Sequence, residues 1–157
     1  MGSTPVVAYT DTHQISGVLP LRGRIRELLV DPMSDYLDLQ DGRATRMSVN
    51  DTIGAFAPRV TIPKQAVHAI TAEDGRHAAN ARQAGNKVSI LTSSWEILGS
   101  VRVNNPNERL SLMLTREFGL FFPVLDATLT WNVNPSIYQT VETVMVNRNQ
   151  VVALSVL

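Results

Sequence analysis

Apolar and polar residues alternate along much of the second half of the chain, which is the pattern of half-buried β-strands. The alternation is clearest at 95–103, where the apolar residues Trp95, Ile97, Val101 and Val103 alternate with Glu96, Ser100 and Arg102. A longer apolar stretch at 120–131, rich in aromatic and β-branched residues, also has strand chemistry. We therefore expect strands at 87–92, 95–103, 120–131, 141–146 and 150–156.

One segment of the second half has helical periodicity instead. In 109–116, Leu110, Met113 and Leu114 recur at i, i+3 and i+4, which predicts a short amphipathic helix. The last two strands are expected to form a hairpin around 147–149, because the Asn residues there tolerate positive φ.

The first half repeats this order of elements. The predicted strands lie at 6–9, 14–21, 36–47, 60–62 and 66–71, with a helix at 24–30, a loop at 50–58 and a final hairpin around 63–65. Each half is therefore expected to be a β-β-α-β-β-β unit of about 70 residues.

Residue correspondences support an internal duplication. Ile15-x-Gly17 matches Ile97-x-Gly99, and Val60-x-Ile62 matches Val144-x-Val146. The offset between matched positions is nearly constant, and its main change falls where 104–108 replaces the two residues 22–23. The order and apolar character of the blocks agree throughout, which favours duplication over two unrelated β-rich stretches.

The duplication divides the chain into residues 1–72, a linker at 73–87 and residues 88–157. The linker is small, polar and rich in Ala, and Gly75 and Gly85 lie near its ends. Short curved strands with one helical turn predict a mainly β fold of two tandem small barrels of SH3-like or Sm-like type. Because a unit of about 70 residues buries little core alone, we expect the copies to pack together or in a larger assembly.

Two motifs resemble a family of small, uncharacterised bacterial β-rich domains. In that family an Arg-Leu-Ser-Asp-x-Leu pattern precedes a Phe-[Ile/Leu]-x-Leu-x-Asp-Ala strand. The matching segments are Arg109-Leu-Ser-Leu-Met-Leu114 and Phe121-Phe-Pro-Val-Leu-Asp-Ala127. The resemblance covers nearly the whole chain as a tandem duplication, and it implies a fold but no activity.

The likeness to Sm-like RNA-binding proteins is looser. That family carries an Arg-Gly element near its last hairpin, whereas the Arg-Gly of this chain, Arg22-Gly23, lies in a different loop. The RNA-binding residues of the family therefore do not transfer, and the likeness is one of barrel shape.

Composition narrows the function classes. Lys plus Arg and Asp plus Glu both total 14, so the chain has no net charge, unlike a strongly basic nucleic-acid protein. Without cysteine it has no disulfide, thiolate metal site or cysteine nucleophile. We find neither a signal peptide nor a membrane-length apolar run, and we expect a soluble, cytoplasmic protein without membrane insertion.

The densest basic run is the candidate anion or nucleic-acid site. Arg22, Arg24 and Arg26 lie at the start of the predicted helix, where free N–H groups favour anions. The alternative is a solvated helix start in which Arg26 pairs with an acidic neighbour.

The candidate interface is the apolar segment that contains Leu120, Phe121, Phe122 and Val124. An exposed apolar edge strand can pair with another chain. The alternative is that this segment is the buried central strand of the second barrel.

Motifs for catalysis are missing from the sequence. His13, His68 and His77 lack the spacing of metal ligands, and neither a nucleophile elbow nor a phosphate-binding glycine loop occurs. We expect no metal and no cofactor. The sequence favours a non-catalytic protein-interaction or assembly module, which binds a protein partner or itself. The alternatives are an anion- or nucleic-acid-binding module that uses the arginines, and a small enzyme or ligand sensor with a pocket between the copies.

Overall fold

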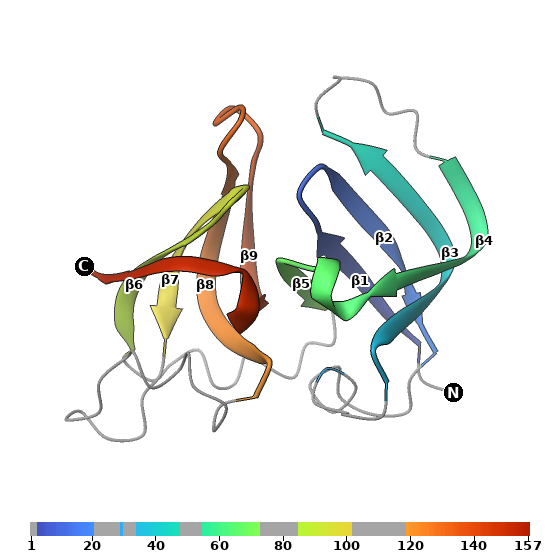
Figure 1. Cartoon of the computed structure of the whole chain (residues 1–157), viewed down its shortest axis with the longest axis horizontal. Coiled ribbons are helices and arrows are strands. Elements are labelled where there is room, and N and C mark those ends of the chain that lie inside the picture. The colour runs from blue at the N-terminus through green and yellow to red at the C-terminus, as the bar shows by residue number, and fades with distance from the viewer. Residues whose placement is uncertain (1–2, 21–28, 30–33, 48–54, 73–84, 102–118) are drawn as a thin grey trace.

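In a computed structural model of the chain, antiparallel β-strands make up 73% of the described residues, which are 3–20, 29, 34–47, 55–72, 85–101 and 119–157. Within these residues ten strands form one sheet, in the order β10-β6-β7-β8-β9-β5-β1-β2-β3-β4 (Figure 1). The prediction of a mainly β protein is confirmed.

The first set of strands comes from the first half of the chain and has the order β5-β1-β2-β3-β4. Its members are β1 (Thr4–Tyr9), β2 (His13–Leu19), β3 (Tyr36–Arg46), β4 (Ala55–Pro63) and β5 (Ala69–Ala72). The second set comes from the second half and has the corresponding order β10-β6-β7-β8-β9. Its members are β6 (Asn86–Thr92), β7 (Trp95–Val101), β8 (Phe121–Trp131), β9 (Tyr138–Asn147) and β10 (Val151–Val156).

Irregularities occur at corresponding places in the two sets. The register of β2 on β3 shifts around Gly17, and the register of β7 on β8 shifts around Gly99. Asp41 and Asp126, which occupy corresponding places on β3 and β8, are the two non-glycine residues with positive φ in the described chain, at 50° and 48°. These bulges bend both sets in the same way, which is visible as two curved halves of the sheet (Figure 1).

The core consists of two clusters of buried side chains, and each cluster takes residues from both halves. Tyr9 and Ala69 of the first set pack in the cluster around Trp95 of the second. We call the cluster around Trp95 the second core cluster and the other one the first core cluster. The first core cluster contains side chains from β1, β3, β4 and β5, and Phe121 and Met145 of the second set pack in it. Burial of apolar area therefore stabilises the two sets together.

The prediction of two separate barrels differs from the strand pairing that is observed. β5 of the first set pairs with β9 of the second, and this pairing makes one continuous sheet. The prediction that each half ends in a hairpin is wrong, because β5 does not pair with β4 and β10 does not pair with β9. A 3₁₀ turn, η1 (Lys64–Ala66), follows β4, and another, η5 (Arg148–Gln150), follows β9. Each turn carries the next strand to the other side of its set, where β5 pairs with β1 and β10 pairs with β6.

Other boundaries differ modestly from the prediction. β4 begins at Ala55, inside the expected loop at 50–58, and β6 begins at Asn86, inside the expected linker at 73–87. The rest of that linker up to residue 84 lies outside the described residues. So do the predicted helices at 24–30 and 109–116, except for Leu29, whose side chain is buried in the first core cluster.

Candidate functional site

The two sets meet where β5 lies against β9. Ala69, Ile70 and Thr71 stand opposite Val146, Met145 and Val144 in an antiparallel ladder. We call this pairing the internal junction. It joins a strand at one edge of the first set to a strand at the opposite edge of the second set, so the contact is head to tail.

Asn147 extends the internal junction beyond the ladder. Its backbone N–H donates to the carbonyl of His68 at 2.9 Å, and its side-chain amide donates to the carbonyls of Val67 at 2.9 Å and Lys64 at 3.3 Å. Asn147 is fully buried, so these bonds satisfy donors that have no access to water. The 3₁₀ turn of the first set is thereby tied to the end of β9.

The turn between β1 and β2 inserts against the second set. The indole N–H of Trp95 donates to the carbonyl of Thr10 at 2.9 Å, and that of Trp131 donates to the carbonyl of Asp11 at 3.3 Å. The Tyr9 ring meets the Trp95 ring edge to face, with centroids 5.1 Å apart. Both tryptophans of the chain thus hold one turn of the first half.

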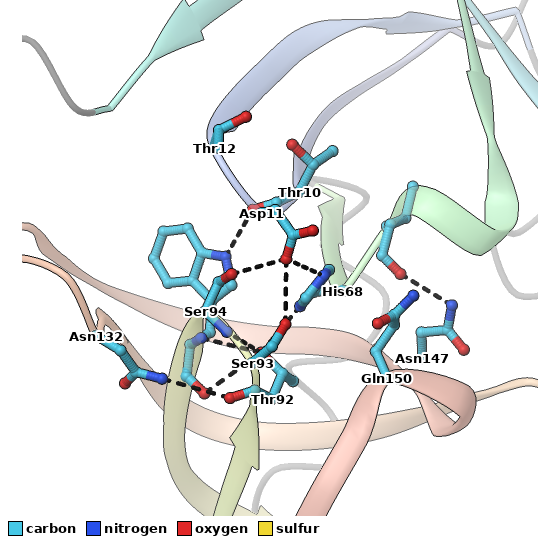
Figure 2. Close-up of polar contacts among 12 residues, drawn as sticks. Thr10, Asp11, Thr12, His68, Thr92, Ser93, Ser94, Asn132, Asn147 and Gln150 are labelled. Atoms are coloured by element: carbon cyan, nitrogen blue, oxygen red, sulfur yellow. Dashed lines mark hydrogen bonds and ion pairs between the residues drawn. The ribbon is translucent and has the colours of Figure 1, made fainter.

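A chain of polar contacts runs from this turn into the buried junction (Figure 2). Asp11 Oδ1 lies 2.9 Å from His68 Nε2 and accepts hydrogen bonds from the hydroxyls of Ser94 at 2.7 Å and Ser93 at 3.1 Å. On the other side of the ring, His68 Nδ1 lies 2.9 Å from the hydroxyl oxygen of Thr92. The backbone N–H of Trp95 donates to that same oxygen at 2.9 Å.

These distances fit a neutral His68 with its proton on Nε2. Nε2–H then donates to the Asp11 carboxylate, and Nδ1 accepts from the Thr92 hydroxyl. Burial lowers the pKa of His68 below its ordinary 6.5, and the Asp11 charge offsets this only in part. The hydrogen bond from Ser94, and then the weaker ones from Ser93 and His68, lower the pKa of Asp11.

The order of groups resembles an Asp–His–hydroxyl relay in outline, but its placement is structural. Thr92 is 3% exposed, and its hydroxyl oxygen accepts backbone N–H groups of its own turn. A buried hydroxyl used in this way has no access to a substrate in solution. What the arrangement does is fasten three segments of the two sets to one another.

The ends of the sheet offer a different kind of site. Within the described residues, β4 pairs only with β3, and β10 pairs only with β6. Each of these two strands therefore has one edge of backbone donors and acceptors that pairs with no other described strand, and we call it the open edge. Apolar side chains are exposed near both edges, and they are Phe56 on β4 and Val152, Val156 and Leu157 at β10.

The candidate interface residues are not at an edge. Phe121, Phe122 and Val124 belong to β8, which pairs with β7 on one side and β9 on the other. All three side chains are buried, and neighbouring Leu120 is half-buried. The alternative interpretation, a buried central strand, describes their position. Arg22, Arg24 and Arg26 lie outside the described residues.

Sequence reasoning missed Asp11 and Thr92, and it considered His68 as a metal ligand, for which its spacing is unsuited. A signal was present in the differences between the two halves. His68 corresponds to Val152, Asp11 to Ser93 and Asn147 to Pro63, so none of these three side chains has its like at the matching position of the other half. Residues that differ in this way are candidates for the contact that breaks the symmetry of a duplication.

No family model, curated protein or solved structure matches the chain. Among the described residues, no helix is long and apolar enough to span a membrane, and no group of three His, Asp or Glu side chains is placed to hold a metal ion.

Proposed function

We propose that this protein is a non-catalytic assembly module, built from two copies of a small barrel-like β unit, whose interaction surfaces are the open edges of β4 and β10. The observation that carries the proposal is that the same kinds of edge already pair with one another at the internal junction. A sheet edge that is left unpaired is a template for another strand.

The duplication supports the proposal. The two sets share their strand order, the positions of their glycine bulges and their positive-φ Asp residues. A unit whose two edges fit each other can associate with further units, and gene duplication joins two such units covalently. The polar contacts of Asp11 and Asn147 then secure the internal junction.

The test is the absolute mass of the purified chain, measured by light scattering over a concentration series. We expect a multiple of 17.3 kDa that grows with concentration. Val152→Lys should return the mass to that of one chain, because a charged side chain at an edge opposes strand pairing. The matched control is Val133→Lys, since Val133 is 73% exposed and Val152 is 72% exposed, but Val133 lies in the loop between β8 and β9.

Two outcomes contradict the proposal as self-association through the edges. One is a mass of 17.3 kDa at every concentration for the unmodified chain. The other is a larger mass that both lysine variants leave unchanged.

A further inference from the structure

We infer that the partner at these edges is a second copy of this chain, whose β10 adds to the open edge of β4 in the register of the internal junction. The inference rests on the proposed function, because it specifies the partner and the geometry of the edge contact. It follows from the strand order together with the residue correspondence between the two halves.

The strand order defines which edges are complementary. In the first set β5 lies at one end and β4 at the other, and in the second set β10 and β9 hold those places. The internal junction pairs the β5 end with the β9 end. The two ends left over are β10, the counterpart of β5, and β4, the counterpart of β9. A β10–β4 contact between two molecules therefore repeats the contact that is already made within one.

The match between Val60-x-Ile62 and Val144-x-Val146 gives the register of the new pairing. At the internal junction Ile70 stands opposite Met145, and Thr71 stands opposite Val144. Moving each residue to its counterpart places Leu154 of one molecule opposite Thr61 of the next. In the same register Ser155 stands opposite Val60, and Ala153 stands opposite Ile62.

The exposure of the side chains fits this docking. Ile70 and Met145, paired at the internal junction, are both buried in the first core cluster. In the single chain their counterpart Leu154 is half-buried, packed against the second core cluster, and their counterpart Thr61 is exposed. An added β4 strand would cover Leu154 and would lie beside exposed Val152, so apolar area would leave water.

The contact between molecules should be weaker than the internal junction. Pro63 stands where Asn147 does and has no N–H, so the backbone bond and the side-chain bonds of Asn147 have no equivalent. Val152 and Ser93 replace His68 and Asp11, which removes the hydrogen bond between the imidazole and the carboxylate. The ladder around Thr61 and Leu154 remains. We therefore expect association that is reversible at micromolar concentrations.

Because the contact is head to tail, a pair of joined molecules keeps one free β4 edge, on one molecule, and one free β10 edge, on the other. Such a contact generates a closed ring if the rotation between neighbours closes, and an open filament if it does not. A two-fold symmetric dimer is not the product of this geometry.

The test uses four proteins with a single cysteine each, which is unambiguous because the chain has none of its own. They are Val60→Cys, Thr61→Cys, Leu154→Cys and Ser155→Cys. Each is mixed with a partner in a thiol redox buffer, and the disulfide-linked heterodimer is quantified by mass spectrometry. We expect linkage in the mixtures 61 with 154 and 60 with 155. A register shift of one position puts side chains on opposite faces, so 61 with 155 and 60 with 154 should link at least tenfold less.

Every variant takes part in one expected pair and one mismatched pair, so a variant that folds poorly lowers both and is recognised by its circular dichroism. Equal linkage in all four mixtures, or preferential linkage in the mismatched ones, overturns the inferred register. Suppose that the inferred register is overturned, but the unmodified chain still has a mass above 17.3 kDa and Val152→Lys has the mass of one chain. The assembly function then survives, and β10 pairs with another strand. If the chain also remains at 17.3 kDa, both proposals fail.

Discussion

His68 and Val152 occupy corresponding places in the two halves, and each suits what its strand touches. His68 is 2% exposed beside the β1–β2 and β6–β7 turns, where Asp11 and Thr92 supply partners for both ring nitrogens. Val152 lies on a strand with nothing beyond it among the described residues and is exposed. The same position is a buried polar link in one half and an apolar edge residue in the other.

The buried imidazole predicts a pH dependence of stability. The pKa of His68 in the folded protein lies below 6.5, so the unfolded chain binds the proton first as the pH falls below about 6.5. The free energy of unfolding should then decrease with falling pH, by at most about 1.4 kcal/mol per pH unit, down to the folded-state pKa of His68. The stabilisation of ionised Asp11 is complete above its ordinary pKa of 3.8, so it adds no slope between pH 5 and 7.

Urea unfolding at several values between pH 5 and pH 7.5 measures this slope. In His68→Gln the slope should be smaller than in the unmodified chain, while the free energy of unfolding at pH 7.5 is also reduced because the link to Asp11 is weakened. An identical slope in the two proteins would show that His68 does not control the acid sensitivity.

The sequence alone could not predict the link that His68 makes. Asp11, His68 and Thr92 are far apart in the chain, and none belongs to a spaced motif, so only the fold brings them together. The apolar side chains were easier to predict, because alternation in a strand implies one buried face. Trp95, Ile97 and Val101 were placed correctly on this ground, and all three are fully buried.

At the scale of elements, the glycines of β2 and β7 set the curvature of each set. A Cβ on Gly99 would lie 2.6 Å from Cγ1 of Val124 and 2.8 Å from the carbonyl oxygen of Leu125. A Cβ on Gly17 would lie 2.8 Å from Cβ of Leu39, which corresponds to Val124. The neighbouring strand therefore passes closer to these positions than any side chain allows.

Gly99→Ala should accordingly lower the free energy of unfolding by about 1–3 kcal/mol, because β8 must move away from β7 to admit the methyl group. The adjacent Ser100→Ala is the control, and it should change stability by less than about 0.5 kcal/mol. Chemical unfolding followed by circular dichroism compares the two. If Gly99→Ala proves as stable as Ser100→Ala, the close approach of β8 does not constrain the bulge.

Strand positions were predictable because their periodicity is local, whereas strand partners were not. The turns at 63–65 and 147–149 suggested hairpins by length and composition. In the structure Val67 N–H donates to the carbonyl of Lys64 within a 3₁₀ turn, and the strands on either side of it diverge. Whether a short turn returns a strand to its predecessor or carries it elsewhere depends here on pairing with β1, which lies near the start of the chain.

At the scale of the whole molecule, the difference between Asn147 and Pro63 predicts how association can be strengthened. Pro63→Asn supplies a backbone N–H and a side-chain amide at the open end of β4, as Asn147 does at the internal junction. If copies associate in the inferred register, this variant should lower the dissociation constant by about tenfold, which corresponds to about 1.4 kcal/mol.

Sedimentation at a series of concentrations measures the dissociation constant. Pro63→Ala is the matched control, because it restores the N–H without the amide and should give a smaller effect. Association that both variants leave unaltered, or weaken, would place the contact away from the end of β4.

The pairing of β5 with β9 inside the chain has a consequence for how an assembly would come apart. Two kinds of contact would alternate along the assembly. One is the β5–β9 pairing within a single chain, and the other is the β10–β4 pairing between the exposed edges of two chains. Dilution would open the contacts between chains first, because the two halves of one chain stay covalently joined. The pieces released would be intact chains, each ready to rejoin, and the half-chain with its small core would never appear as a free species.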